Sequence, residues 1–117
     1  MKLIYIAGAY TAPTAVQRGA NVQRARETAA NVAALGGFPV TPHQMQLGIE
    51  DAGDEPFWYE GTMELMRRCD AVVVAPMSAA SRGVTREVNE AHRLGKPVFY
   101  IDPVANDLPA LASYLAS

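Results

Sequence analysis

Four short stretches of the chain are almost continuously apolar. A half-buried strand would instead alternate between apolar and polar positions. They span residues 2–7, 38–41, 70–75 and 97–102. Strands read in this way when helices cover both faces of a parallel sheet, because neither side of the strand then meets water. The pattern predicts four parallel β-strands.

Helical periodicity fills the segments between and after these strands. Apolar side chains recur at spacings of three and four residues over 20–35, 56–68, 83–94 and 107–116, which is the period of an amphipathic helix. Glycines follow the first and third of these segments and are typical of helix ends. We expect Val84, Val88, Ala91 and Leu94 to form the buried stripe of the third helix.

Strands that alternate with helices predict an α/β fold: an open, doubly wound parallel sheet between two helical layers, Rossmann- or flavodoxin-like, in the order 2-1-3-4. The length of 117 residues suits one domain over 1–117. In such sheets ligands bind beyond the carboxyl ends of the strands, where the strand order reverses. A small-molecule site should therefore lie among loops 8–19, 42–55 and 75–83.

Net charge and cysteine content limit the binding partners and the cellular compartment that we expect. The net charge is -2, and Lys and Arg are scattered among acidic residues, so duplex nucleic acid is not an expected partner. The one cysteine, Cys69, has no second thiol to pair with, which fits a reducing cytoplasm. No apolar stretch approaches the roughly 18 residues of a membrane span, and the N-terminus lacks a signal-peptide core. We expect a cytoplasmic protein that does not bind membranes.

Glu87 is the residue most suggestive of chemistry. It falls between Val84 and Ala91 on the apolar stripe of the third helix, where a carboxylate needs an explanation. One interpretation is structural: free backbone N–H groups and the helix dipole stabilise it near the helix start. The other is functional: the side chain points into the cleft as a nucleophile or base.

The loops at the predicted cleft add weaker candidates. Ser81 and Gly83 open the third helix, where backbone N–H groups can bind an anion or Ser81 can simply cap the helix. Gly8, Tyr10 and Thr11 follow the first strand without a dinucleotide or P-loop motif. We interpret the aromatic run 57–59 as helix packing, a pocket wall or a stacking surface for a base.

His43 follows the second strand and could contact a substrate or have no role. Neither His43 nor His92 has cysteines or carboxylates at metal-ligand spacing, so we expect no metal site and no cofactor. His92 should lie on the solvent face of its helix.

Taken together, the sequence resembles the superfamily of nucleoside 2-deoxyribosyltransferases and deoxynucleoside 5'-monophosphate N-glycosidases. The similarity covers most of the chain and is most specific in a small-residue loop, a helix-opening glycine and a glutamate four residues later, matched by Gly83 and Glu87. Further matches are Ile4-Tyr5-Ile6-Ala7-Gly8, Tyr10-Thr11, Asn21, Ala25, Pro42-His43, Cys69-Asp70-Ala71-Val72-Val73 and Gly95-Lys96-Pro97-Val98.

The resemblance implies cleavage or exchange of the N-glycosidic bond of a 2'-deoxynucleoside or its 5'-monophosphate. It makes Glu87 the nucleophile that forms a glycosyl ester, as in retaining glycosidases. Tyr5 matches a tyrosine that lies near this glutamate, and Ser81 with Gly83 matches a phosphate-binding turn. Relatives assemble as dimers or larger, so a homo-oligomer is implied as well.

Thr62 departs from the pattern of the active relatives, which carry an aspartate eight residues before the aspartate matched by Asp70. A threonine hydroxyl cannot protonate a leaving base at neutral pH as a carboxylic acid can. One alternative is therefore a non-catalytic nucleotide-binding module that has lost its proton donor. Another is a glycohydrolase of NAD or a signalling nucleotide, because the same glutamate chemistry applies to any N-riboside, although the absent dinucleotide motif argues against it.

Overall fold

A computed structural model describes residues 1–102, 104 and 106–117 of the chain. Its four strands are β1 (Leu3–Ala7), β2 (Phe38–Val40), β3 (Ala71–Val74) and β4 (Val98–Tyr100). They form one sheet in the order β2-β1-β3-β4, and each neighbouring pair is parallel. The predicted fold class and strand order are confirmed.

The two central strands, β1 and β3, are buried almost throughout, whereas the edge strands β2 and β4 are mostly half-buried. Central strands lose solvent on both faces and along both edges, which explains their continuous runs of apolar residues. Tyr5 lies opposite Val40 of β2 and Val72 of β3. This register places the one polar side chain of β1 in the middle of the sheet.

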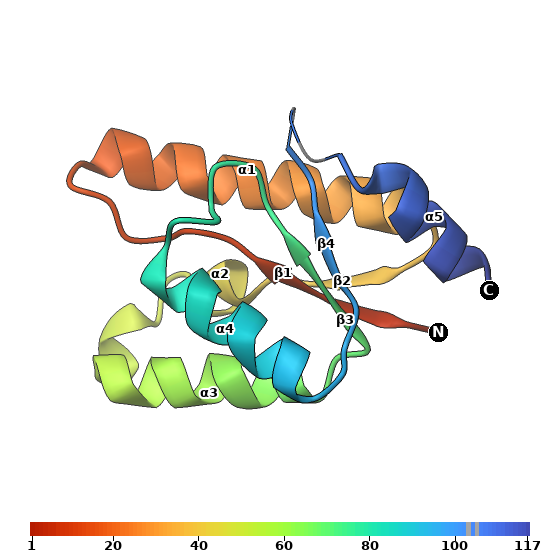
Figure 1. Cartoon of the computed structure of the whole chain (residues 1–117). Coiled ribbons are helices and arrows are strands. Elements are labelled where there is room, and N and C mark those ends of the chain that lie inside the picture. The colour runs from red at the N-terminus through yellow and green to blue at the C-terminus, as the bar shows by residue number, and fades with distance from the viewer. Residues whose placement is uncertain (103, 105) are drawn as a thin grey trace.

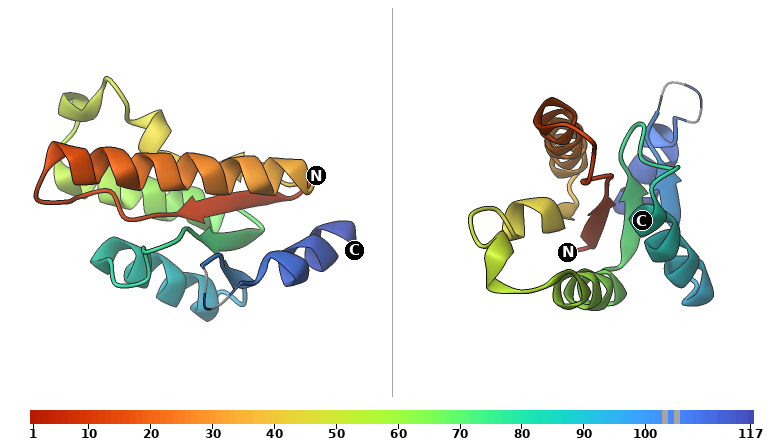
Figure 2. Two further views of the ribbon diagram at one scale, coloured as in Figure 1. Left: turned by 90° about the horizontal axis from the view of Figure 1, so that it is seen from above. Right: turned by 90° about the vertical axis from the view of Figure 1, so that its left-hand side faces the viewer.

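Helices cover both faces of the sheet (Figures 1 and 2). On one face lie α1 (Ala15–Ala34) and α5 (Leu108–Ala116), which pack on Ile4, Ile6 and Val73 through Val32 and Leu111. On the other lie α3 (Glu55–Arg67) and α4 (Arg82–Arg93). Their contacts with the sheet are made by Met63, Met66, Val84, Val88 and Ala91, which surround Tyr5, Val72 and Val74. No helix among the described residues is long and apolar enough to cross a membrane.

Helix α1 begins five residues earlier than the expected start at residue 20. Thr14 caps it by accepting a hydrogen bond from the Gln17 amide at 3.1 Å, the interaction that favours threonine at this position. Residues 15–20 are all exposed, so this first part of the helix carries no apolar stripe and the sequence pattern missed it. The expected loop 8–19 is correspondingly shorter.

The segment expected to be a long loop, 42–55, contains two short elements. Helix α2 (Pro42–Met45) follows β2 directly, and a 3-10 turn (Glu50–Ala52) precedes α3. Pro42 suits the first turn of a helix because its ring already has a helical φ and its missing N–H would be unpaired there. Both elements are too short for periodicity to predict.

The remaining helix and strand ends differ from the expected ones by one or two residues. At the C-cap of α4, Leu94 is 41% exposed, so its expected place in the buried stripe is wrong. His92 is exposed, as expected. In α5, Leu111 is fully buried while Leu108 and Leu115 are partly buried against it.

Candidate functional site

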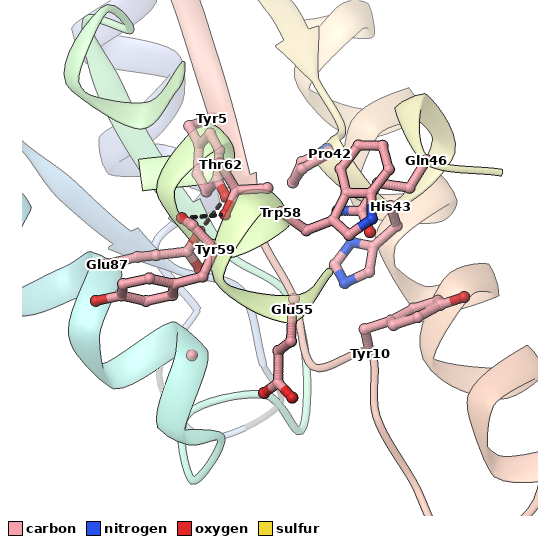
Figure 3. A pocket seen from close by; sticks show the side chains of 12 residues that line it. Tyr5, Tyr10, Pro42, His43, Gln46, Glu55, Trp58, Tyr59, Thr62 and Glu87 are labelled. Atoms are coloured by element: carbon pink, nitrogen blue, oxygen red, sulfur yellow. Dashed lines mark hydrogen bonds between the residues drawn. The ribbon is translucent and has the colours of Figure 1, made fainter. Parts of the chain in front are cut away.

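A cavity of about 190 Å³ opens beyond the carboxyl ends of β1 and β2, beside the start of α4 (Figure 3). We call it the inner cavity. This is the region where the strand order reverses between β1 and β3, as the rule for open α/β sheets requires. Its lining residues are Tyr5, Gly8, Tyr10, Pro42, His43, Gln46, Glu55, Trp58, Tyr59, Thr62, Gly83 and Glu87.

Glu87 lies in the second turn of α4 and faces this cavity. Its side chain is 9% exposed, and its carboxylate accepts a hydrogen bond from the Tyr5 hydroxyl. Burial raises the pKa of Glu87 to about 7, because an ionised carboxylate loses its hydration there, while the hydrogen bond from Tyr5 opposes this rise. The carboxylate thus bonds to a side chain of the central strand β1.

Tyr5 supplies the donor from the centre of the sheet. It is 1% exposed, and burial together with the nearby charge of Glu87 raises the pKa of its phenol well above the ordinary value. The nearby Thr62 hydroxyl acts on this pKa in the opposite direction. The phenol therefore keeps its proton and holds the Glu87 carboxylate in one orientation. Figure 3 shows Tyr5, Thr62 and Glu87 grouped on one side of the cavity.

His43 and Tyr10 form the other side. Their rings lie 5.2 Å apart between centroids at an angle of 44°. Burial lowers the pKa of His43, although a backbone hydrogen bond with Gly8 opposes this, so the imidazole is neutral at pH 7. A Cβ on Gly8 would lie 3.4 Å from Cε1 of His43. Glycine at this position lets the strand end and the ring approach closely.

A second hollow of about 520 Å³ adjoins the inner cavity at the start of α4. We call it the outer cleft; it shares Gly8, Tyr10, Glu55, Tyr59, Gly83 and Glu87 with the inner cavity and adds Ala9, Thr11, Ser81, Arg82, Val84 and Arg86. The Ser81 hydroxyl caps α4 by accepting from the Val84 amide at 3.4 Å. The Arg86 guanidinium lies 5.1 Å from the centroid of the Tyr59 ring. Positive side chains and a helix start therefore border the outer part of the site.

The fold brings every sequence-predicted candidate to these two adjoining spaces. The inner cavity is lined by Tyr5, Gly8, Tyr10, His43, Thr62, Gly83 and Glu87. Thr11 and Ser81 line the outer cleft. Their functional roles remain predictions, whereas their proximity is a property of the fold.

Sequence reasoning missed part of the wall that α2 and α3 contribute. Gln46 and Glu55 line the inner cavity without having been singled out as individual residues. Both lie in segment 42–55, whose length had already placed it among the expected site loops.

Of the aromatic residues 57–59, Trp58 and Tyr59 line the inner cavity, whereas Phe57 lies at the protein surface. Trp58 lines the inner cavity, and its indole N–H donates to the Glu50 carbonyl at 2.9 Å. Phe57 stands edge-on to Trp58 but is 61% exposed. Helix packing is thus wrong for Phe57, because it lies on the side of α3 that faces away from the sheet.

Within the described part of the chain, no group of three or more His, Cys, Asp or Glu side chains is arranged to hold a metal ion. Cys69 is free and buried, and burial raises its pKa to about 11. A thiol of this kind is a poor nucleophile. Cys69 is therefore not expected to react at this site.

Comparison with solved structures defines the class of fold. The chain is similar to a 2-deoxyribosyltransferase from Bacillus psychrosaccharolyticus, with a TM-score of 0.66 and 19% identity over 86% of this chain and 72% of that one. It is also similar to a 2-deoxyribosyltransferase from Leishmania mexicana, with a TM-score of 0.60 and 22% identity over 87% of this chain and 65% of that enzyme. The fold implied by the sequence resemblance is confirmed.

The family is shown by the sequence itself. A family model described as a domain of unknown function (DUF7768) matches residues 2–101, and the chain belongs to that family. A search of curated proteins finds no match.

Proposed function

We propose that this protein cleaves or exchanges the N-glycosidic bond of a nucleoside or its 5'-monophosphate, with Glu87 as the nucleophile. The observation that carries the proposal is a buried carboxylate that faces a cavity and is held by a tyrosine of the central strand. A pKa of about 7 leaves a substantial fraction of Glu87 ionised at neutral pH. The similarity of fold to two 2-deoxyribosyltransferases supports nucleoside chemistry.

In the proposed reaction an ionised Glu87 oxygen attacks the anomeric carbon of the sugar. The bond from this carbon to the base nitrogen breaks, its electron pair leaves with the base, and a glycosyl ester forms through an oxocarbenium-like transition state. Water or a second base then attacks the same carbon and releases the carboxylate. Tyr5 positions Glu87 by its hydrogen bond.

The two parts of the site suit the two ends of such a substrate. The inner cavity, with aromatic rings in its wall, would hold the base. The outer cleft, with Ser81, Gly83, Arg82 and Arg86, would hold a 5'-phosphate. We propose a homo-oligomer built from this single domain, by analogy with the assemblies implied for its relatives.

A second candidate function follows from Thr62. Its hydroxyl donates to the Tyr59 carbonyl at 3.1 Å and lies at the wall of the inner cavity, in the position where active relatives carry an acid. A site without that acid could bind nucleotides without cleaving them.

The test is base release from a panel of 2'-deoxynucleosides and their monophosphates, followed by chromatography. Glu87→Gln keeps the hydrogen bond with Tyr5 but removes the nucleophile, and should lower release by at least about a thousandfold. Glu90→Gln is the matched control on the same helix. Glu90 pairs with Arg67 and Arg93 away from the cavity, so this variant should keep wild-type release.

Release that survives in Glu87→Gln would remove Glu87 from the mechanism. Ligand binding without release in the wild type would favour the binding module instead.

A further inference from the structure

The positive side chains of the site lie only in its outer part. The described residues that line the inner cavity include the acidic Glu55 and Glu87 but neither lysine nor arginine. The outer cleft adds Arg82 and Arg86. His43 contributes no positive charge, because burial lowers its pKa. The inner cavity therefore favours a positively charged group. The outer cleft shares the two acids, and its arginines are the groups that can pair with a phosphate.

The walls of the inner cavity favour a cation for a second reason. Tyr10, Trp58 and Tyr59 present aromatic rings there, and the faces of such rings attract cations. The volume of about 190 Å³ is slightly larger than the roughly 150 Å³ cavity that holds one benzene molecule. One aromatic ring with small substituents fits this space, whereas a two-ring purine would extend out of it.

The inner cavity is also poorly equipped to donate a proton. Tyr5 keeps its proton because burial raises its pKa, and Thr62 offers only a hydroxyl at the cavity wall. Glu55 is exposed to solvent at the start of α3. A neutral base leaves as an anion unless it is protonated, whereas a cationic heterocycle leaves as a neutral molecule and needs no proton.

From these three observations we infer that the leaving group of this site is a cationic one-ring heterocycle, an N-glycosylated pyridinium such as nicotinamide, on a sugar that can carry a 5'-phosphate. This inference rests on the proposed function and names its substrate class. Such a substrate can be cleaved at a cavity whose wall offers the Thr62 hydroxyl in place of a buried acid.

Cleavage of a pyridinium glycoside by Glu87 needs no general acid. The Glu87 carboxylate forms a bond to the anomeric carbon, the carbon–nitrogen bond breaks, and its electron pair neutralises the pyridinium nitrogen. Water then attacks the anomeric carbon of the ester, the carboxylate departs, and the proton of that water passes to the solvent. The net reaction converts pyridinium glycoside and water into sugar, neutral pyridine and one proton.

Pairs of substrates that share a sugar test the inference. Nicotinamide riboside is compared with uridine, and nicotinamide 2'-deoxyriboside with 2'-deoxyuridine, by chromatography of the released base. The pyridinium member of each pair should have a kcat/KM at least about a hundredfold higher, since a general acid typically contributes that much or more to a neutral leaving group. With the pyridinium substrate, kcat/KM should rise with pH to a plateau and not fall again below pH 9.

Thr62→Asp separates the effect of the site from the intrinsic reactivity of pyridinium glycosides. It should raise kcat/KM for the neutral bases by at least about tenfold and leave pyridinium cleavage at or below its wild-type rate. Thr62→Asn is the matched control, because an amide of the same size cannot protonate a base, and it should give no gain.

A binding measurement tests, independently of catalysis, whether the inner cavity prefers a cation. The 1-methylnicotinamide cation should bind the wild type about tenfold more tightly than neutral nicotinamide, and Glu55→Gln should reduce that ratio.

Equal or faster cleavage of the neutral member of each pair would overturn the inference and leave the proposed function standing. Cleavage of neither class would overturn both.

Discussion

Glu87 makes the stability of the folded chain depend on pH. Burial raises its pKa from 4.5 to about 7, so between these two values the folded chain binds more protons than the unfolded chain. The free energy of unfolding therefore falls as the pH rises through this window, and the contribution of Glu87 amounts to about 3 kcal/mol. Glu87→Gln has no such group to ionise and should be the more stable chain at pH 8.

Urea unfolding of both chains at pH 4.5 and pH 8 measures this contribution. The difference in unfolding free energy, variant minus wild type, should grow by about 3 kcal/mol between the two conditions. A difference that stays constant would mean that Glu87 is not desolvated in the folded chain.

At the residue scale the sequence predicted part of the site. Glu87 was identifiable because a carboxylate on an apolar helical stripe conflicts with burial. Glu55 gave no such signal, since it is an exposed residue at the start of an amphipathic helix. Only the packing of α3 beside the strand ends makes it part of the cavity wall.

Helix α3 forms one wall of the inner cavity, and its start depends on a single cap. The Asp54 carboxylate accepts a hydrogen bond from the Phe57 amide at 3.0 Å. Asp54→Ala leaves this amide without its partner and should lower the free energy of unfolding by about 1 kcal/mol. The midpoint of urea unfolding, followed by the fluorescence of Trp58, measures the change.

Asp54→Asn is the control for the cap, because an asparagine side chain also accepts from the amide and should retain most of the stability. An alanine variant as stable as the wild type would show that the cap contributes nothing.

At the element scale, local signals decide how well a helix is predicted. Helices α3 and α4 have caps and apolar stripes that can be read from the sequence, and their ends were expected to within one or two residues. The first turns of α1 face solvent throughout. Their helical state depends on the Thr14 cap and on continuation into the packed part of the helix, which periodicity does not detect.

Gly37 lies where α1, β1 and α5 meet, and the packing of the whole molecule requires its small size. A Cβ there would lie 2.9 Å from Cγ1 of Ile4, 3.0 Å from Cγ1 of Val32 and 3.2 Å from Cδ2 of Leu115. Gly37→Ala should lower the free energy of unfolding by about 2 kcal/mol, because these side chains must shift within a packed core. Thermal unfolding measures the loss.

Gly19→Ala provides the matched control for this glycine substitution. Gly19 lies inside α1, and a Cβ there would meet nothing within 4 Å. Alanine is the better helix former, so this variant should be more stable than the wild type by about 0.5 to 1 kcal/mol. If both variants destabilised the chain equally, the crowding at Gly37 would not be the cause.

The sequence by itself determined the fold class and the conflict at Glu87, because burial on both faces and helical periodicity are recorded in local patterns. The strand order was one of several that right-handed crossovers allow. The tertiary structure decided which side chains share a cavity. Tyr5 and Glu87 are 82 residues apart in the chain, and their contact exists only because α4 packs across β1 and β3. The placement of the acids Glu55 and Glu87 in a cavity without lysine or arginine also arises in this way, since distances between remote segments are set by packing and not by sequence spacing.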